Sequence, residues 1–285
     1  MPLIDAREIT KSYPARGGLR RVLRRVSLSA ARGEFVAILG AMGTGKSTLL
    51  SILAGLIPPD EGEITIDGAP VRGVRPDAAV VFQNYSLLPW FTALENVRLA
   101  VAAARPNVRK AEQRAHALRA LEQVGLGNAV HRRPGQLSGG MRQRVAIARA
   151  FATMPEVLFL DEPFGALDAL TRETLQQELA RLCSVADRPL TVVMITNSVE
   201  EALLLADRII PIVPGPPATL GAPIPVDLPR PRTATLLARD EQASQVRTHV
   251  VATLTAALRR PRRPAAAVCG EPSMLGTPDL AKAEE

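Results

Sequence analysis

A glycine-rich stretch, GAMGTGKST, lies at residues 40–48 between an apolar run and the start of a helical pattern. It fits G-x-x-x-x-G-K-[ST], in which glycines let the backbone curl until successive N–H groups point at a polyphosphate, and the following helix adds its positive dipole end. In this pattern the lysine reaches the β- and γ-phosphates and the next hydroxyl ligates magnesium. The stretch therefore predicts a site for ATP and Mg²⁺, with nucleotide contacts from Gly40, Gly43, Gly45, Lys46, Ser47 and Thr48 and with Ser47 as a metal ligand.

A second motif, VLFLDEP, places two carboxylates at the end of an apolar run. Asp161 is positioned to hold the magnesium ion through water, and Glu162 to polarise an attacking water molecule. Phosphate loops also serve kinases, switches, motors and recombinases, and an acidic pair after a strand is often only structural. The two motifs in one chain, however, favour hydrolysis of the nucleotide.

A third motif, QLSGGMRQRVAIARAF, begins at residue 136 and opens a helical pattern without Pro or Gly until Pro155. Ser138, Gly139 and Gly140 supply a hydroxyl and bare backbone amides at the positive end of a helix dipole, which makes a second anion site. One chain would then hold two phosphate-binding surfaces. If both serve one ATP, the simplest geometry is a head-to-tail pair of subunits, each completing the site of the other.

These motifs need a sheet to position them, and the sequence predicts an α/β fold. Runs at residues 3–10, 22–29, 34–39 and 63–66, separated by Gly and Pro, indicate strands with an antiparallel portion near the N-terminus. The later runs EVLFLDEP and LTVVMITN are unbroken apolar segments followed by helical patterns. Such segments are typical of parallel strands that are buried on both faces.

The segment between the two sets of strands, about residues 86–155, shows apolar residues at helical spacing with Pro106 as a break, and we expect a helical insert there. After Pro211 the proline content rises, as is typical of an extended strap. We expect an ATP-binding domain over residues 1–230, a C-terminal helical extension over residues 231–261 and a disordered tail over residues 262–285.

Composition limits the alternatives. The chain has 285 residues, a net charge of +7 and only 3% aromatic residues, so extensive stacking on single-stranded nucleic acid is not expected. Arginines concentrate at residues 19–25 and 230–263, either as solvated surface charge or as a face for anionic lipid or an acidic partner. Cys183 and Cys269 are far apart, which argues against disulfides and zinc and for a cytosolic chain. No run approaches the ~18 apolar residues that cross a bilayer, so a membrane role would act through partners.

In order and spacing, the motifs resemble those of the ATP-binding subunits of ABC transporters, over about residues 3–229. The resemblance includes VFQNYSLLPW with Gln83, the LSGGM-type signature, LFLDEP and GALDAL with Asp168. It implies a P-loop NTPase core of the ABC type and roles for Gln83 in catalysis and magnesium binding. Tyr13, in ITKSYP, matches the aromatic residue that stacks on adenine, and Asp168 matches a residue of the nucleotide site.

Within this family, SLLPW, TALENV, ADRIIPIVPGPPATLG and VDLPRPR look like the branch that imports nitrate, sulfonates, taurine, cyanate or bicarbonate, with nitrate members closest. This implies transmembrane permease subunits, a second ATP-binding subunit of the same or a different kind, and an extracytoplasmic solute-binding protein. The chain would act at the cytoplasmic face of the inner membrane. Pro89, Trp90 and Phe91 are expected to line the permease groove, with packing inside the insert as the alternative.

Two departures from the family pattern are visible. Ala41 and Met42 replace Pro or Ser and Ser or Asn, at positions that contribute mainly backbone. Asn197 stands where the family usually has a histidine that contacts the γ-phosphate. Its amide can donate a hydrogen bond but cannot take up charge, so we expect a working ATPase that this asparagine could slow.

Alternatives to this reading remain. Asn197 could be only a helix cap, since Asn favours that position. The chain could be a regulatory or weakly catalytic subunit paired with an active partner. A non-transport ABC ATPase acting on nucleic acid is a third possibility, against which stand the missing long heptad region, second cassette and paired zinc-type cysteines. We therefore expect no nucleic-acid partner.

Overall fold

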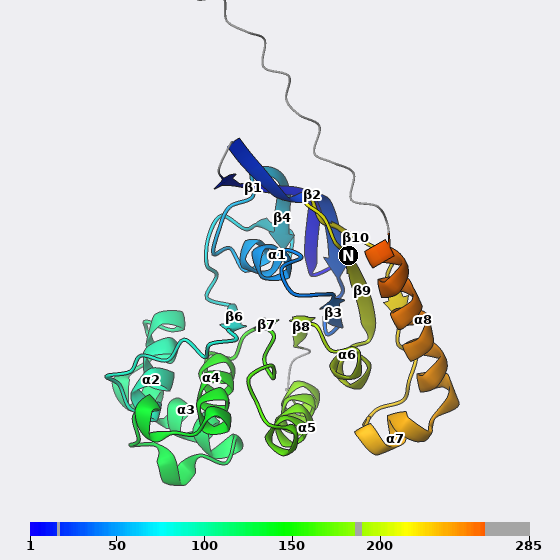
Figure 1. The fold of residues 1–285 in the computed structure, drawn as a ribbon. Coiled ribbons are helices and arrows are strands. Elements are labelled where there is room, and N and C mark those ends of the chain that lie inside the picture. Colours follow the sequence, from blue (N-terminus) through cyan, green and yellow to red (C-terminus); the bar gives the residue numbers. More distant parts are fainter. Residues whose placement is uncertain (16–17, 186–189, 260–285) are drawn as a thin grey trace, which may run out of the picture.

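The computed structural model describes residues 1–15, 18–185 and 190–259. The tail expected at residues 262–285 lies outside this part of the chain. The described residues form an antiparallel sheet, a mostly parallel central sheet, and helices that cover the central sheet (Figure 1). The predicted α/β fold with an N-terminal antiparallel portion and a helical insert is confirmed.

The antiparallel sheet has the strand order β2-β1-β4-β5. Its strands are β1 (Ile4–Ala15), β2 (Gly18–Ala30), β4 (Glu61–Ile66) and β5 (Ala69–Pro70). β1 and β2 extend beyond the apolar runs of the sequence, because their ends pair as a hairpin whose side chains are largely exposed. Hydrophobic alternation marks only the part of a strand that packs on a core, so the hairpin end gave no such signal.

The central sheet has the order β10-β9-β3-β8-β7-β6, with β11 paired to β9. Five strands run parallel: β3 (Phe35–Leu39), β6 (Ala78–Val81), β7 (Val157–Asp161), β8 (Thr191–Thr196) and β9 (Arg208–Val213). β10 (Thr219–Leu220) and β11 (Ile224–Pro225) pair antiparallel with β9 and occupy the proline-rich strap. Every residue of β3 and β8 is buried, which explains their unbroken apolar sequences.

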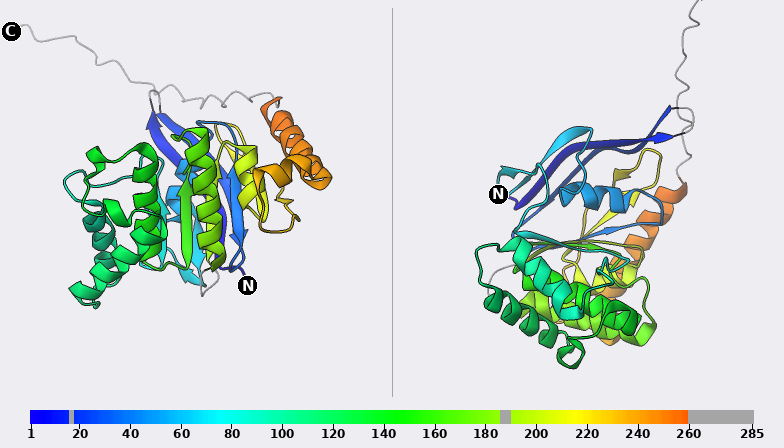
Figure 2. Two further views of the ribbon diagram at one scale, coloured as in Figure 1. Left: turned by 90° about the horizontal axis from the view of Figure 1, so that it is seen from below. Right: turned by 90° about the vertical axis from the view of Figure 1, so that its left-hand side faces the viewer.

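Helix α1 (Lys46–Leu53) lies between the two sheets, the helices from α2 to α7 lie on the opposite face of the central sheet, and α8 runs along its β9 side (Figures 1 and 2). α2 (Ala93–Ala104), α3 (Lys110–Gln123) and α4 (Gly139–Ala152) form the insert, with short 3₁₀ turns at residues 127–129 and 134–136. α5 (Ala169–Val185) and α6 (Val199–Leu205) follow β7 and β8. α7 (Ala234–Arg239) and α8 (Glu241–Arg259) pack beside α6 and β9. Among the described residues, no helix is both long and apolar enough to cross a membrane.

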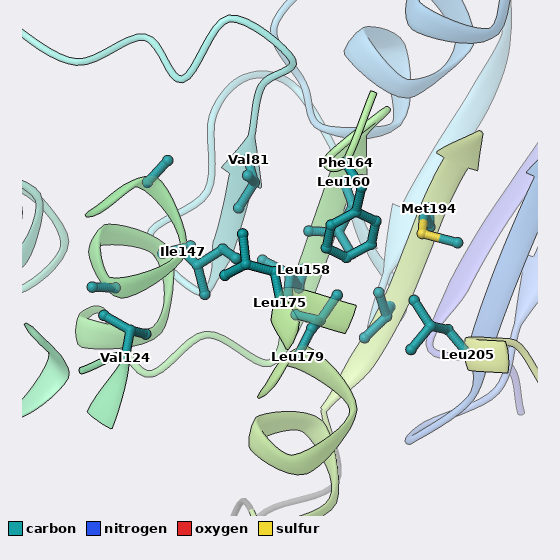
Figure 3. Close-up of a cluster of buried hydrophobic side chains, with 14 of the residues drawn as sticks. Val81, Val124, Ile147, Leu158, Leu160, Phe164, Leu175, Leu179, Met194 and Leu205 are labelled. Carbon is teal, nitrogen blue, oxygen red and sulfur yellow. The ribbon is translucent and has the colours of Figure 1, made fainter. Parts of the chain in front are cut away.

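Alternation along the buried strands divides the core into two layers. Phe159 of β7 points toward α1 and the antiparallel sheet, whereas its neighbours Leu158 and Leu160 point toward the helices of the other face. Figure 3 shows Leu158 and Leu160 among Ile147 of α4 and Leu175 of α5. All of these side chains are essentially inaccessible to solvent. The parallel strands are thereby fixed between two apolar layers, and their carboxyl ends are held at one edge of the sheet.

Candidate active site

The phosphate loop connects the end of β3 to the start of α1, as its sequence predicted. Gly45 precedes the helix with φ 90° and ψ 9°, a left-handed conformation that an L side chain rarely adopts. Gly40 is required by close packing, because a Cβ there would lie 2.3 Å from Cγ2 of Ile212 on β9. The Thr44 hydroxyl donates to the Ala41 carbonyl over 2.8 Å and closes the loop on itself. The curled backbone before a helix start is the arrangement that binds phosphate.

Lys46 is the first residue of α1 and is 4% exposed. Its Nζ donates to the carbonyls of Gly40 and Ala41, each over 2.9 Å, and lies 3.3 Å from Oε1 of Glu162. The loop thus holds the ammonium group in one position before any ligand binds. A polyphosphate in the loop would compete for this cation with two carbonyls and one carboxylate.

Asp161 and Glu162 lie at the carboxyl end of β7, next to α1. The Ser47 hydroxyl donates to Oδ1 of Asp161 over 3.2 Å. Burial raises the pKa of the Asp161 carboxyl above its usual value, and this effect exceeds the opposing influence of the Ser47 hydrogen bond. Glu162 is buried, and its backbone N–H donates to the Ile195 carbonyl of β8 over 2.9 Å. Pairing of β7 with β8 therefore fixes the position of both carboxylates.

Ser47 and Asp161 are suitable ligands for magnesium. Mg²⁺ takes oxygen ligands, and in nucleotide sites the protein supplies only one or two of them while phosphates and water supply the rest. Among residues 1–15, 18–185 and 190–259, no group of three or more His, Cys, Asp or Glu could form a metal cage of protein side chains. A hydroxyl beside a single carboxylate matches the magnesium pattern of nucleotide sites.

A hollow of about 570 Å³ opens over the loop and brings together residues from distant segments. Tyr13, Gln83 and Glu162 line it together with the loop residues 42–48. Tyr13 is 37% exposed, and Nζ of Lys11 lies 5.8 Å from the centre of its ring. A Cβ on Gly165 would lie 3.8 Å from Nε2 of Gln83 and 3.9 Å from Oε2 of Glu162, so both side chains approach this glycine. An aromatic face, bare amides, a lysine and the Glu162 carboxylate therefore surround one space, while Asp161 lies behind Ser47 and does not line it.

The sequence analysis did not identify two parts of this wall. Arg20 lines the hollow from β2, where it is paired directly with Tyr13 of β1. Gly215, Pro216 and Ala218 line it from the β9–β10 loop, which is fixed to β2 by the Ala218 N–H donating to the Val22 carbonyl over 2.8 Å. The strand register could have indicated Arg20 if the hairpin had been recognised. Nothing local in the sequence indicated the loop, because its contacts join segments about two hundred residues apart.

The signature residues lie away from this hollow. Ser138 caps α4, its hydroxyl accepting from the Met141 N–H over 3.3 Å, and none of Ser138, Gly139 and Gly140 lines the space above the phosphate loop. A Cβ on Gly140 would lie 2.4 Å from Cγ2 of Thr171 on α5. The helix start is thus exposed on the same chain as the phosphate loop but does not reach its ligand space.

Asp168 also lies outside the hollow, at the start of α5. Its Oδ1 accepts from the Thr171 N–H over 3.0 Å, and this hydrogen bond lowers the pKa of the Asp168 carboxyl. In this chain alone, Asp168 is seen as a helix cap. Its expected role in nucleotide binding stays a prediction.

Asn197 follows the last residue of β8 and is exposed. Ser198, not Asn197, caps α6, because the Ser198 hydroxyl accepts from the Glu201 N–H over 3.3 Å. The alternative that Asn197 serves as the helix cap is therefore wrong. Asn197 is also not among the residues that line the hollow, so its contact with a γ-phosphate stays a prediction.

Comparison with known proteins agrees with this geometry. A sequence model for the ABC transporter family matches residues 23–165. The nitrate import ATP-binding protein of Synechococcus elongatus is 49% identical over 85% of this chain and 88% of that protein. A bicarbonate transport ATP-binding protein of Synechocystis sp. is 46% identical over 85% of this chain and 86% of its own length.

A solved structure shows the same fold. The dimeric ATP-binding cassette MJ0796, in a post-hydrolysis state with ADP and phosphate, superposes with a TM-score of 0.71 at 34% identity, covering 79% of this chain and 99% of that one. The phosphate loop, the Asp161 and Glu162 carboxylates at the end of β7 and the separate signature helix are the components of a cassette of this kind. The chain belongs to the ABC transporter family and is an ATP-binding subunit that hydrolyses ATP.

Proposed function

We propose that this chain powers an importer for a small anion and that the anion is nitrate. The observation that carries the choice of solute is the 49% identity to a nitrate import subunit over most of both chains. Bicarbonate is the second candidate, because one bicarbonate transport subunit is 46% identical over 85% of this chain, and another is 50% identical over 76% of this chain but only 32% of its own length. In this proposal the solute does not bind at the nucleotide site, so the choice between nitrate and bicarbonate rests on these relatives.

In the proposed site, ATP lies in the hollow with its adenine against Tyr13 and its phosphates in the loop. Lys46 turns from the carbonyls of Gly40 and Ala41 toward the β- and γ-phosphates, which are stronger acceptors because they are charged. Ser47, Asp161 and Gln83 hold the magnesium ion, which neutralises charge on the same phosphates. The binding energy of the site is thus directed at the phosphates that are separated in the reaction.

Glu162 is proposed to orient and polarise the attacking water. In the structure its carboxylate is 3.3 Å from Nζ of Lys46. A γ-phosphate that engages Lys46 would weaken this pair and leave the carboxylate available to accept a proton from water. The ion pair therefore couples the arrival of the nucleotide to the availability of the base.

Ser138, Gly139 and Gly140 are proposed to contact the γ-phosphate of a second subunit. They lie outside the hollow of their own chain, and the helix dipole and Ser138 hydroxyl make them a second anion site, separate from that hollow. A head-to-tail pair would bring each signature helix over the phosphate loop of the partner. Two ATP molecules would then be enclosed between two subunits.

Permease subunits in the membrane are the proposed partners, with an extracytoplasmic solute-binding protein delivering the anion and this chain at the cytoplasmic face. Trp90 is 63% exposed, and its ring lies 6.3 Å from that of Phe91 in an edge-on arrangement. The buried side chain of Asn96 fixes this segment, accepting from the Leu88 N–H over 2.8 Å and donating to the Phe91 carbonyl over 3.2 Å. A rigid loop thus presents an exposed aromatic residue, which suits a docking surface.

The test uses the complete transporter in vesicles, with its solute-binding protein outside and ATP inside. Nitrate is expected to stimulate ATP hydrolysis and to accumulate, while bicarbonate at equal concentration does neither, and a Lys46→Ala transporter serves as the background. Stimulation by bicarbonate alone would replace nitrate with the second candidate. Stimulation by neither anion would contradict both proposed solutes and leave the sulfonates, taurine and cyanate to be tested in the same assay. Trp90→Glu should release the permease while leaving the ATPase activity of the free subunit unchanged.

A further inference from the structure

A second hollow, of about 700 Å³, lies at the edge of the central sheet opposite the phosphate loop. It is enclosed by the ends of α3, α4 and α5 and by the start of β8, where the helical insert meets the core. Leu190 precedes β8 and Glu156 precedes β7, so the amino ends of these parallel strands form its floor. None of the described residues that line this hollow also lines the nucleotide site.

Basic side chains from three elements converge on this second hollow. Arg105 follows the last residue of α2, Arg119 lies on α3 and Arg181 on α5. The Arg181 guanidinium donates to the Gln123 carbonyl over 3.2 Å. Neither Arg105 nor Arg119 forms a salt bridge with any of the described residues. Glu156, a carboxylate of the lining, is engaged elsewhere, with its Oε2 2.9 Å from Nη1 of Arg32.

The contacts of His116 show that the space inside this hollow is positively charged. Its Nδ1 accepts from Nη2 of Arg119 over 3.2 Å, which requires the neutral ring. Burial lowers the pKa of His116, and the positive charges of Arg119 and Arg105 lower it further, against a smaller opposing effect of Glu112. The imidazole is therefore held neutral, and the positive charge of the two arginines around it would favour a bound anion.

Apolar side chains supply another part of the wall. Phe151 of α4, Leu182 of α5 and Leu190 lie around the cations together with Ala120 and Ala152. Leu190 is 7% exposed, whereas Phe151 and Leu182 are partly exposed toward the hollow. An apolar enclosure of several hundred cubic ångströms with a few charged groups at one side is typical of sites for small organic molecules.

We propose that this second hollow binds a small organic anion, whose carboxylate or phosphate pairs with Arg105 and Arg119 and whose apolar body lies against Phe151, Leu182 and Leu190. A planar guanidinium can donate two hydrogen bonds to two oxygens of either a carboxylate or a phosphate, and the hydrogen bond to His116 keeps Arg119 oriented. The ligand would touch α3 of the insert and α5 of the core at once. Because the site is at the far edge of the sheet, ATP and this anion would bind the same chain together.

An alternative role for these arginines is to neutralise the carbonyl ends of the helices that finish here. Arg181 serves the end of α3 in this way. Arg119, however, lies within α3. Its side chain donates to the ring of His116 and not to a carbonyl at a helix end. The two roles predict different behaviour on adding an anion, and this difference can be measured.

The probes are benzoate, phenyl phosphate and uncharged benzamide, titrated into the full-length chain at millimolar concentration. The readout is the ring-proton NMR signal of His116, with His131 and His249 as internal references, since the chain has three histidines. A bound anion should raise the pKa of His116 by roughly one unit, because an opposite charge a few ångströms away favours imidazolium. Benzoate and phenyl phosphate distinguish carboxylate from phosphate as the preferred group, and benzamide should have no effect.

Arg119→Gln and Arg105→Gln should each abolish the response, whereas Arg114→Gln, on α3 but outside the hollow, should retain it. None of these residues belongs to the nucleotide site, so retained ATP hydrolysis shows that the variants are folded. A His116 signal that neither anion moves, or that benzamide moves as far, would overturn the proposal. So would an anion response that survives both glutamine variants. Loss of thermal stability without any anion response would assign the arginines to the helix ends.

Discussion

Replacing Lys46 with alanine removes the only cation that the structure aims into the phosphate loop from α1. Two hydrogen bonds of 2.9 Å to Gly40 and Ala41 and a 3.3 Å contact with Glu162 are lost together. Loss of a single group that stabilises developing charge costs roughly 3–4 kcal/mol, or about a hundredfold to a thousandfold in turnover. We therefore expect Lys46→Ala to reduce the rate of ATP hydrolysis at least about a hundredfold.

The same substitution should also destabilise the chain without nucleotide. Glu162 is 9% exposed, and its carboxylate would be left without its cation. Breaking a buried ion pair by removing one partner costs about 3–5 kcal/mol. A Glu162→Gln change alongside Lys46→Ala should recover part of this loss, since an amide is less costly to bury than a carboxylate.

Steady-state ATPase and thermal unfolding of the parent, the two single variants and the double variant measure both effects. Lys110→Ala is the matched control, because Lys110 is also the first residue of a helix, α3, but lines neither hollow. Parental turnover in Lys46→Ala would refute the assignment of the site. Equal unfolding temperatures of Lys46→Ala and the parent would refute the argument from the buried pair.

Three further predictions concern other residues of the site. Arg20→Ala should raise the KM for ATP several-fold with little change in kcat, because Arg20 lines the hollow opposite Tyr13. Arg21→Ala is the control and should leave KM unchanged, since Arg21 is paired with Ser12. Equal effects of the two variants on KM would mean that only the net charge of the hairpin matters. Asn197→Ala should lower kcat more than nucleotide affinity and Asn197→His should maintain or raise it in the complete transporter, and identical rates in all three would remove Asn197 from the mechanism. The raised pKa of Asp161 means that folding favours its protonated form, so this carboxyl stabilises the fold most at low pH and less as pH rises through the folded pKa. Magnesium-dependent ATP binding should therefore weaken on acidification already above the usual carboxyl range, and binding whose pH profile is the same in Asp161→Asn would contradict this.

The sequence predicted those parts of the site whose geometry is local. The phosphate loop is specified by glycines that the chain needs within a few residues of Lys46, and the end of β7 by the change from apolar residues to Asp161. The two-layer core followed from the same information, because unbroken apolar strands have to be covered on both faces.

Features that depend on pairing between residues far apart in the sequence could not be predicted from local sequence patterns. Arg20 enters the hollow only because the β1–β2 hairpin places it opposite Tyr13. The β9–β10 loop closes the wall only because Ala218 bonds to β2. The capping of α6 by Ser198 rather than Asn197 was also missed, since both residue types favour that position and only the backbone decides between them.

The central claim is that the ATP site is completed by the signature helix of a second subunit. Light scattering of Glu162→Gln with ATP and magnesium tests it most directly, because blocked hydrolysis should preserve the closed pair. We expect a doubled mass with ATP, a single mass without it, and a single mass with ATP when Ser138→Arg is added to block the signature surface. A Glu162→Gln chain that binds ATP and stays a monomer, or a pair that forms equally well with Ser138→Arg, would contradict it.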